Sequence, residues 1–433
     1  MSLASETGKT GLVEGYHPLD VQTLPRYLGA IGTCAEKLGG GPDGWQVDEV
    51  GDGNLNLVFI VRGPSGSLVV KQALPYVRLV GESWPLPLKR AFFEQEALVT
   101  QIACVPERLP AVYHYDHEMA LTVMEHLTPH IILRKGLIAG IRYPKFAEHI
   151  AEFMAQTLFR TSDLHLPAAE KKRRIALFCD NTELCRITED LVFTDPYRIA
   201  ELNRWTSPQL DGMAAAFRAD AALKREAQVL KEMFMNRAEA MIHGDLHSGS
   251  IMVTQSETRV IDPEFAFYGP RGFDIGAVIG NLFLAYFAQP GHADATDDRQ
   301  EYAAWILDQI ELIWKTFQTR FLQLWEQEGH GDIYVAELFN DAEGAAVLAD
   351  HRKACMQQLL QESLGFAGVK MVRRILGLAH VEDLESIEDP DLRAACETRA
   401  LLLGRALIVN HRSYDTVTAV RHSAEKLQGG GEA

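Results

Sequence analysis

The most informative parts of the sequence are two neighbouring stretches, MIHGDLHSGSIMVT at residues 241–254 and VIDPEF at residues 260–265. They place Asp245 in a polar loop and Asp262 17 residues later, with a short hairpin of apolar triplets between them. Phosphoryl transfer uses such a pair, because one carboxylate orients the hydroxyl nucleophile and accepts its proton while the other holds magnesium against the nucleotide phosphates. The spacing therefore predicts a phosphotransferase.

The second aspartate has an acidic neighbour, in the sequence Asp262-Pro263-Glu264. Side chains two positions apart in an extended segment point to the same side, so the two carboxylates can face one metal ion. Magnesium binds a few carboxylates together with phosphate oxygens and water. We therefore predict that Asp262 and Glu264 bind Mg²⁺.

The loop HGDLH allows two other interpretations. His243, Asp245 and His247 alternate along the chain and could ligate zinc in a hydrolase. The same residues could also form a polar turn whose histidines bond to the backbone. Both alternatives stay open at this point, although the rest of the chain supplies further parts of a kinase in the right order.

The N-terminal region supplies features that suit a nucleotide. Three strands joined by glycine turns are predicted at residues 45–50, 57–61 and 67–71. The backbone N–H groups of the loop at residues 51–56 could cover phosphates, although Asn56 stands where a GxGxxG pattern has its third glycine. Lys71 ends the third strand. We expect it to contact phosphate and to pair with Glu94 rather than Glu96 on the following helix.

The order of elements predicts an α+β protein with two lobes. Further strands are expected at residues 112–117 and 119–124, and helices at residues 89–102, 145–164, 183–193, 222–240, 301–327, 333–364 and 391–410. The N-terminal lobe, residues 1–127, would be an antiparallel β lobe with one helix that binds the nucleotide. The larger, mostly helical lobe, residues 128–433, would carry catalysis and the substrate. The joining segment, Met124 to Leu127, either binds an adenine edge through its backbone or is a plain linker.

Composition and charge limit the partners. With 42 Lys and Arg against 59 Asp and Glu, the net charge is −17, which argues against an extended nucleic-acid surface. The first 20 residues lack the apolar region of a signal peptide, and the apolar run at residues 275–288 is too short to cross a bilayer. We expect a cytoplasmic protein without a membrane partner, with residues 275–288 as a buried helix and the six cysteines as free thiols.

These segments together resemble the protein-kinase-like fold in its small-molecule branch, alongside aminoglycoside and choline kinases, because His-Gly-Asp stands in place of His-Arg-Asp. Four stretches are more specific: GDGNLNLVFIV at 51–61, VVKQALPYVRLVGESWPL at 69–86, MIHGDLHSGSIMVT at 241–254 and VIDPEFAFYGPRGFDIGAVIGNLF at 260–283. They closely resemble the 5-methylthioribose kinase family of methionine salvage, from about residue 10 to about residue 420. The resemblance implies Mg²⁺-dependent transfer of phosphate from ATP to the 1-hydroxyl of S-methyl-5-thioribose, and a homodimer.

The resemblance also implies roles for single residues. Asp245 would be the catalytic residue at the sugar hydroxyl. The nucleotide would be bound by Asn54, Lys71, Glu125, His126, Leu127, Asp262, Pro263 and Glu264, with adenine held by the backbone of residues 125–127. The sugar would be bound by Asp245 and by the adjacent pair Arg373 and Arg374. Ser250 stands where protein kinases place an asparagine ligand, and Glu264 could supply the missing anionic ligand.

The arginine pair bears on the choice of substrate. An aminoglycoside or choline would be a cationic acceptor, which the pair disfavours, and a non-catalytic nucleotide-binding protein would lack Asp245, Lys71 or Asp262. Adjacent residues of a regular helix diverge by about 100°. We therefore expect one of Arg373 and Arg374 at a helix end, where it reaches the sugar or the transferred phosphoryl group. A solvated helix face is the alternative.

Overall fold

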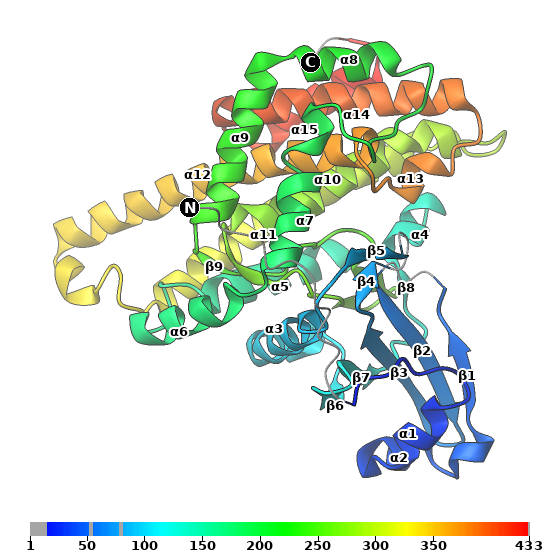
Figure 1. Cartoon of the computed structure of the whole chain (residues 1–433). Coiled ribbons are helices and arrows are strands. Elements are labelled where there is room, and N and C mark those ends of the chain that lie inside the picture. Colours follow the sequence, from blue (N-terminus) through cyan, green and yellow to red (C-terminus); the bar gives the residue numbers. More distant parts are fainter. Residues whose placement is uncertain (1–14, 52–54, 78–80, 432–433) are drawn as a thin grey trace, which may run out of the picture. The chain divides into compact units, whose positions relative to one another are not determined.

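The computed structural model describes residues 15–51, 55–77 and 81–431 (Figure 1). The chain divides into two compact units, Met1–Thr128 and Pro129–Ala433. The first contains an antiparallel sheet with helices, and the second is mostly helical. This confirms the α+β fold class predicted from the sequence. Asn54, predicted to contact the nucleotide, lies outside the described residues.

The first unit is built on a five-stranded antiparallel sheet with the order β1-β2-β3-β7-β6. Its strands are β1 (Gln46–Glu49), β2 (Asn56–Gly63), β3 (Gly66–Ala73), β6 (Val112–Asp116) and β7 (Leu121–Glu125). The remaining elements are α1 (Leu24–Gly29), α2 (Gly32–Leu38), β4 (Tyr76–Val77), β5 (Gly81–Pro85) and α3 (Arg90–Cys104). The hairpin of β2 and β3 closes where Gly63 pairs with Gly66, as the turn residues predicted.

The alternation of β3 separates the apolar core from the predicted nucleotide lysine. Leu68 and Val70 are buried in a core that also contains Leu28 of α1 and Leu38 of α2. Because successive side chains of a strand point to opposite faces, Lys71 lies on the other face of the sheet, on the side of α3. The strand thus presents its one charged residue away from the core.

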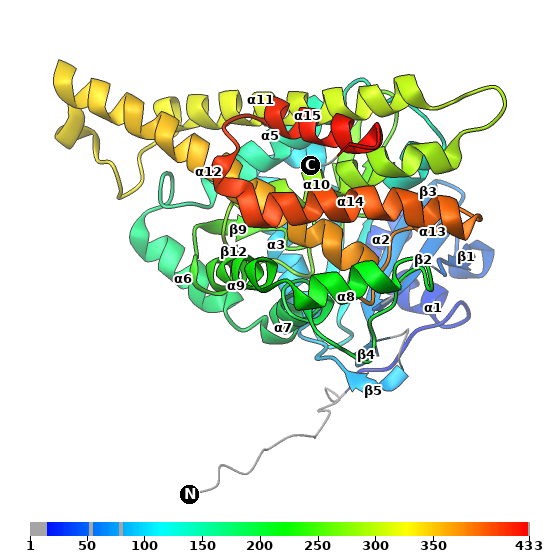
Figure 2. The ribbon, with the colours of Figure 1, turned by 90° about the horizontal axis from the view of Figure 1, so that it is seen from above.

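The second unit is a set of helices packed around α10 (Gly272–Ala288), all of whose residues are buried. The other helices are α4 (Leu133–Ile138), α5 (Phe146–Arg160), α6 (Ala168–Phe178), α7 (Thr182–Leu191), α8 (Asp211–Ala219), α9 (Ala221–Asn236), α11 (Gln300–Glu328), α12 (Ala342–Leu376), α13 (Glu382–Glu385), α14 (Pro390–Asn410) and α15 (Val417–Gln428). Helices α11, α12 and α14 contact α10 (Figure 2).

Helix α10 is a core helix, as predicted, but it is longer than expected. The stretch Gly272–His292 is long and apolar enough to cross a membrane by length and composition, yet its apolar window is 100% buried inside the protein. Complete enclosure by protein is the environment of a core helix and satisfies its apolar side chains without lipid.

Glycines let the neighbouring helices approach closely. A Cβ atom at Gly280 of α10 would lie 2.7 Å from the backbone oxygen of Ala367 in α12. One at Gly368 would lie 2.5 Å from the backbone oxygen of Gly404 in α14. Both distances are shorter than real Cβ contacts, so larger side chains would force α10, α12 and α14 apart.

Short strands in the second unit hold the motif loops. Strand β9 (Ala240–Ile242) pairs with β12 (Phe267–Gly269). Strand β10 (Ile251–Val253) pairs with β11 (Thr258–Val260) on one side and with β8 (Ile131–Ile132) on the other. The β element predicted within residues 241–264 is therefore confirmed.

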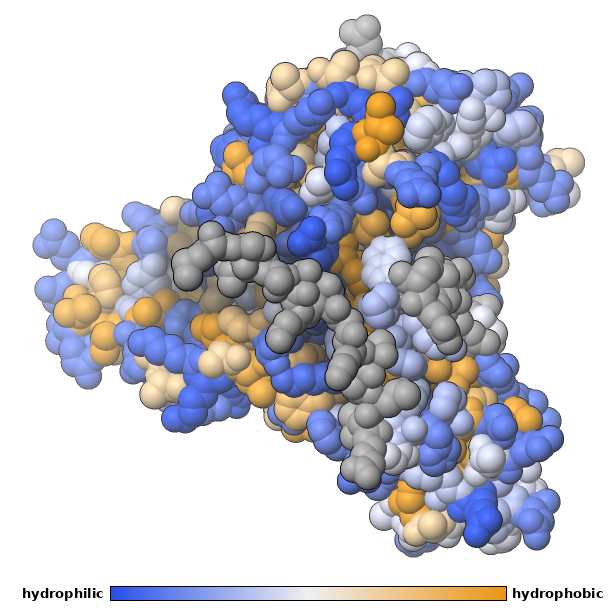
Figure 3. Space-filling view, viewed as in Figure 1, coloured by the Kyte–Doolittle hydropathy of each residue, from blue (hydrophilic) through white to orange (hydrophobic). Residues whose placement is uncertain are grey.

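The helix predicted at residues 333–364 exists, but its bounds were wrong. Helix α12 begins at Ala342, where the side chain of Asp341 accepts a hydrogen bond from the backbone N–H of Gly344 at 2.6 Å, and it continues to Leu376 before Gly377. The last part of the helix was missed because residues 362–376 are all buried. Without an exposed face, the sequence shows no alternation of polar and apolar residues with the helical period. Four apolar side chains before and in its first turns are exposed, namely Ile333, Val335, Leu338 and Val347. Figure 3 shows orange, hydrophobic patches among the blue at this end of the molecule.

Replacing Gly280 with alanine should destabilise the second unit. The new methyl group meets the backbone of α12, which cannot rotate aside as a side chain can. We expect the free energy of unfolding to fall by about 1–3 kcal/mol, as for other overpacked cores. Gly212 of α8 is the matched control, because a Cβ there meets nothing within 4 Å. Chemical denaturation of both variants checks this, and equal stabilities would contradict the close helix contact.

Candidate active site

A buried carboxylate of α10 holds the loop between β9 and β10. Asp274 is only 3% exposed and accepts hydrogen bonds from the backbone N–H groups of His243 at 2.6 Å and Gly244 at 3.1 Å. Gly244 has a φ of 83°, and a Cβ atom there would collide with the backbone of Phe265. A glycine is needed at this position, and the start of the loop is anchored to the core.

Sequence reasoning missed Asp274. Burial raises its pKa, although the nearby His243 and the two N–H donors act in the opposite direction. The available signal was an acidic residue within the otherwise apolar stretch FDIGAVIG, because a carboxylate is rarely buried in a core helix unless it is bonded.

His243 ties this loop to the segment that carries the predicted metal ligands. Its Nε2 lies 2.9 Å from the backbone oxygen of Ile261, which can only accept, so Nε2 carries the hydrogen. Its Nδ1 is then free to accept the backbone N–H of Asp245 at 3.3 Å. Ser250 donates its hydroxyl to the backbone oxygen of Asp245 at 3.0 Å, which closes the loop from the other side.

Both carboxylate oxygens of Asp245 have partners. Lys370 Nζ lies 3.2 Å from Oδ1, and His247 Nε2 lies 3.2 Å from Oδ2. Burial raises the pKa of Asp245, but His247, Lys370 and Arg374 lower it by more, so the pKa lies well below its usual value. Asp245 is therefore ionised and held in one orientation.

His247 takes part in this arrangement as a neutral ring. Its Nδ1 accepts the backbone N–H of Gly249 at 2.8 Å and faces Arg134 Nη2 at 3.3 Å. Burial lowers its pKa to about 3, so at neutral pH the hydrogen sits on Nε2 and is donated to Asp245. The ring nitrogens of His243 and His247 are thus both engaged within the protein, which argues against the zinc interpretation.

A second ion pair, between Arg134 and Asp383, lies beside the ring of His247. Arg134 of α4 lies with Nε 3.2 Å from Asp383 Oδ2 and donates to Ser248 Oγ at 3.2 Å. Burial raises the pKa of Asp383 to about 6. Arg134 therefore connects the start of α13 to the loop that carries Asp245.

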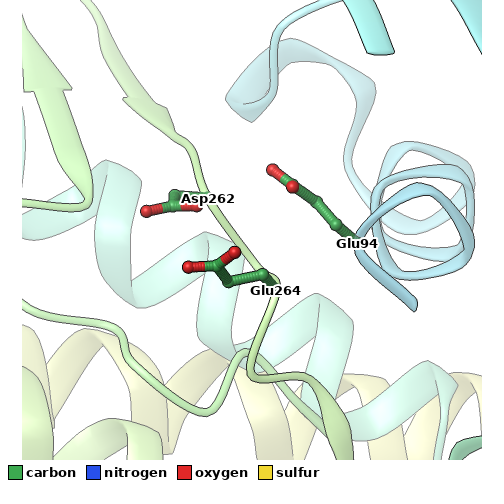
Figure 4. Close-up of side chains that lie close together, drawn as sticks. All are labelled: Glu94, Asp262 and Glu264. Carbon is green, nitrogen blue, oxygen red and sulfur yellow. The ribbon is translucent and has the colours of Figure 1, made fainter. Parts of the chain in front are cut away.

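Asp262 and Glu264 come together as predicted, but for a different reason. A carboxylate oxygen of each lies within 4.8 Å of one of the other (Figure 4). The segment is not a strand, and Asp262 has a left-handed φ of 68°, so strand alternation was the wrong argument. Asn181 fixes the segment instead: its side-chain amide donates to the backbone oxygens of Glu264 at 3.0 Å and Ala266 at 3.1 Å.

In the first unit, the predicted pairing of Lys71 with Glu94 is confirmed. Lys71 Nζ lies 2.9 Å from Glu94 Oε1, and the side chains are 10% and 5% exposed. Figure 4 shows Glu94 projecting from α3. The partner is therefore Glu94 and not Glu96, and the lysine is held in place by a largely buried charge.

The segment predicted to bind adenine is partly committed to other bonds. The backbone N–H of Glu125 donates to the oxygen of Ala111 at 2.8 Å, so it is not available to a nucleotide. His126 Nδ1 lies 2.8 Å from Ser67 Oγ. Any adenine contact through a backbone N–H would have to come from His126 or Leu127.

The arginine pair lies in the last turn of α12, and both residues are buried, at 9% and 7% exposure. The helix-end prediction is confirmed, and the solvated-face alternative is wrong. Arg374 Nη1 donates to the backbone oxygen of Ala379 at 3.3 Å. Within the described chain, Nε and Nη1 of Arg373 have no hydrogen-bond partner. Burial lowers the pKa of Arg373, yet a guanidinium stays charged, so these donors suit an anion.

Comparison with known proteins assigns the family. A sequence model of the phosphotransferase enzyme family matches residues 46–312. Methylthioribose kinase 1 of Oryza sativa subsp. japonica is 51% identical over 410 residues, which cover 94% of this chain and 95% of that protein. The chain belongs to the methylthioribose kinase family. Methylthioribose kinase of Escherichia coli O45:K1 is 50% identical over 95% of this chain and 98% of that protein.

A more distant member of the methylthioribose kinase family, from Yersinia enterocolitica, is still 42% identical over 93% of this chain and 96% of that protein. The match therefore spans both compact units and not only the phosphotransferase motifs. It confirms the family to which the four stretches of sequence pointed.

Replacing Asp274 with asparagine should weaken both the fold and catalysis. An amide offers one acceptor oxygen where the carboxylate offers two, so one N–H group of the loop loses its partner, at a cost of about 1–3 kcal/mol. We expect a lower melting temperature and a lower kcat with the KM for ATP little changed. Asp350→Asn is the control, because Asp350 is 79% exposed. Equal kcat for the two variants would show that Asp274 does not position the loop.

Proposed function

We propose that this chain transfers the γ-phosphoryl group of ATP to the 1-hydroxyl of S-methyl-5-thioribose, which gives S-methyl-5-thioribose 1-phosphate and ADP in methionine salvage. The observation that carries the proposal is the Asp245 carboxylate, ionised and held on both oxygens. Support also comes from relatives named methylthioribose kinase that match 94–95% of the chain at 50–52% identity.

Asp245 acts as hydrogen-bond acceptor and late proton acceptor. As the sugar oxygen forms its bond to the γ-phosphorus, the bond from that phosphorus to the bridging oxygen of ADP breaks, and the hydroxyl proton moves to Asp245. The low pKa of Asp245 makes it a weak base. In a loose transition state little proton transfer is needed early, so its main contribution is to orient the hydroxyl.

Asp262 and Glu264 would hold Mg²⁺. Their carboxylate oxygens are the hard ligands that magnesium prefers, and an approach within 4.8 Å brings them near the spacing that two ligands of one ion need. When bound, the ion neutralises the phosphate oxygens of the nucleotide. Pro263 between them fixes its own φ, which supports a static rather than a flipping segment.

The first unit would bind the rest of the nucleotide. Lys71 of strand β3 is held by Glu94 of α3 and would contact the phosphates. Asn54 would do so from the preceding loop, and the backbone of residues 125–127 would bind adenine, with His126 or Leu127 as the N–H donor.

Arg373 would contact the transferred phosphoryl group or the sugar hydroxyls. Two of its nitrogens are buried without a partner in the described chain, which is costly unless a ligand supplies acceptors. Arg374 already donates to Ala379, so it would act mainly through its charge and packing.

A kinase acting on an aminoglycoside or choline is the weaker candidate. The charges that act on Asp245 include Lys370, Arg373 and Arg374, and Arg134 lies close to both arginines. A cationic acceptor would be repelled at this place, whereas a neutral thiosugar would not. The retention of Asp245, Lys71 and Asp262 argues against a non-catalytic nucleotide-binding protein.

A cytoplasmic location, a homodimer and the absence of nucleic-acid and membrane partners remain predictions. Cell fractionation tests the first. Light scattering of the purified chain tests the second, with a mass near twice 48.2 kDa expected.

The function is tested by measuring ADP release with ATP, Mg²⁺ and a panel of acceptors: methylthioribose, an aminoglycoside and choline. We expect turnover with methylthioribose and none above background with the other two. Asp245→Asn should lower kcat about 10²–10⁴-fold and leave ATP affinity nearly intact, because an amide has no negative charge to orient the hydroxyl and cannot accept its proton. Turnover of Asp245→Asn near the wild-type rate would remove Asp245 from this role.

The two arginines should differ in their effect. Arg373→Ala should lower kcat/KM for methylthioribose by about 10²-fold. This corresponds to a loss of about 3 kcal/mol of transition-state stabilisation, which is typical of a single donor to developing charge. Arg374→Ala should mainly reduce stability or raise KM. Steady-state kinetics and thermal melting of both variants decide this. If neither variant alters turnover or KM, the arginines do not contact the reacting groups.

A further inference from the structure

We propose that Lys370 is a positioning residue of the phosphotransfer centre, which acts through Asp245 and whose ammonium group is needed for turnover. The inference rests on the proposed function. Lys370 is 2% exposed, its Nζ lies 3.2 Å from Asp245 Oδ1, and it stands 4.4 Å from the ring centre of Phe273. The lysine of α12 therefore lies against Phe273 of α10 and reaches the carboxylate in the loop between β9 and β10.

Lys370 belongs to a set of cations on one side of α12. Arg373 and Arg374 follow it at three and four positions, the spacing at which helix side chains are neighbours. Asp245 interacts with all three charges. Only Lys370, however, makes a direct ion pair with Asp245 among the described cations of this helix.

Stability does not explain this lysine. Burying an ammonium and a carboxylate costs so much desolvation that an apolar side chain of the same size is often as stable. A charge kept at 2% exposure against the catalytic carboxylate therefore points to a role in the reaction.

The role follows from what Asp245 would be without it. Burial favours the neutral carboxylic acid, and His247 opposes this as a hydrogen-bond donor. The ammonium of Lys370 adds a full positive charge and fixes Oδ1. With the lysine neutral, the pKa of Asp245 would rise and the carboxylate could turn, so fewer enzyme molecules would hold the hydroxyl correctly.

The protonation of Lys370 gives this role a signature in pH. The groups that face it are Asp245 from the loop, Asp274 from α10, and Arg373 and Arg374 from its own helix. Burial and the two arginines lower its pKa to about 8, against the opposing effect of Asp245. The ammonium is therefore present below that pH and lost above it, so kcat/KM for methylthioribose should fall as the pH rises through about 8.

Three enzymes test the proposal: Lys370→Met, Lys370→Arg and the control Lys353→Met, whose lysine lies on the same helix with a side chain 75% exposed. Lys370→Met should lose at least about tenfold in kcat, because a positioned base contributes about 10²–10⁴-fold, while its KM for ATP changes little. In the pH profile of kcat/KM for Lys370→Met, the fall at alkaline pH, the alkaline limb, should vanish. The fall at acid pH should shift to higher pH, because the pKa of Asp245 rises without the ammonium. Lys370→Arg should recover part of kcat and shift the alkaline limb well upward, since a guanidinium stays charged. Lys353→Met should match the wild type.

Each outcome separates the role of Lys370 from the function itself. Absence of methylthioribose phosphorylation by the wild type would refute the proposed function. With an active wild type, the lack of an alkaline limb near the stated pH would overturn the proposal for Lys370, and this needs no variant. Wild-type kcat in Lys370→Met, or an unchanged limb in Lys370→Arg, would also overturn it. If Lys370→Met melts below the assay temperature, Lys370→Arg and the wild-type profile decide.

Discussion

The carboxylate of Asp274 accepts hydrogen bonds from two backbone N–H groups at the start of the loop that carries Asp245, and the geometry of the candidate active site depends on these two bonds. Because α10 is buried along its whole length, the acceptor cannot shift without opening the core. The loop then places His243, whose ring reaches the backbone of Ile261, one residue before the acidic pair. One constraint is thus passed from the helical core to Asp245 and to Asp262.

The candidate active site gathers positive charge, whereas the whole chain is strongly negative. The net charge is −17, yet Asp245 pairs with Lys370 and also experiences the positive charges of Arg373 and Arg374. Such a cluster is costly to bury, and the chain gains little stability from it. It is useful where negative charge develops on a transferred phosphoryl group, because preorganised cations in a dry site need no rearrangement during the reaction.

The sequence predicted those features that depend on local pattern. The β2–β3 hairpin, the β element around the Asp245 loop and the pairing of Lys71 with Glu94 follow from turn residues, motif spacing and order along the chain. Features that depend on distant packing escaped prediction. Asp274, Asn181 and Lys370 act across 30 to 125 residues of sequence, through bonds that only the fold creates. Because residues 362–376 are all buried, their sequence lacks the polar and apolar alternation of a helix, and the end of α12 was therefore not predicted.

The glycines of the helical core and the cations of the site belong to one argument. Gly280 and Gly368 let α12 lie against α10 and α14 at backbone distance, and Lys370 follows only two residues after Gly368. A lysine side chain has a limited reach, and Asp245 lies in the loop that Asp274 of α10 anchors, so the closeness of α12 to α10 favours the ion pair of Lys370 with Asp245. The small residues thus keep α12 beside α10, the arrangement on which the proposed role of Lys370 depends.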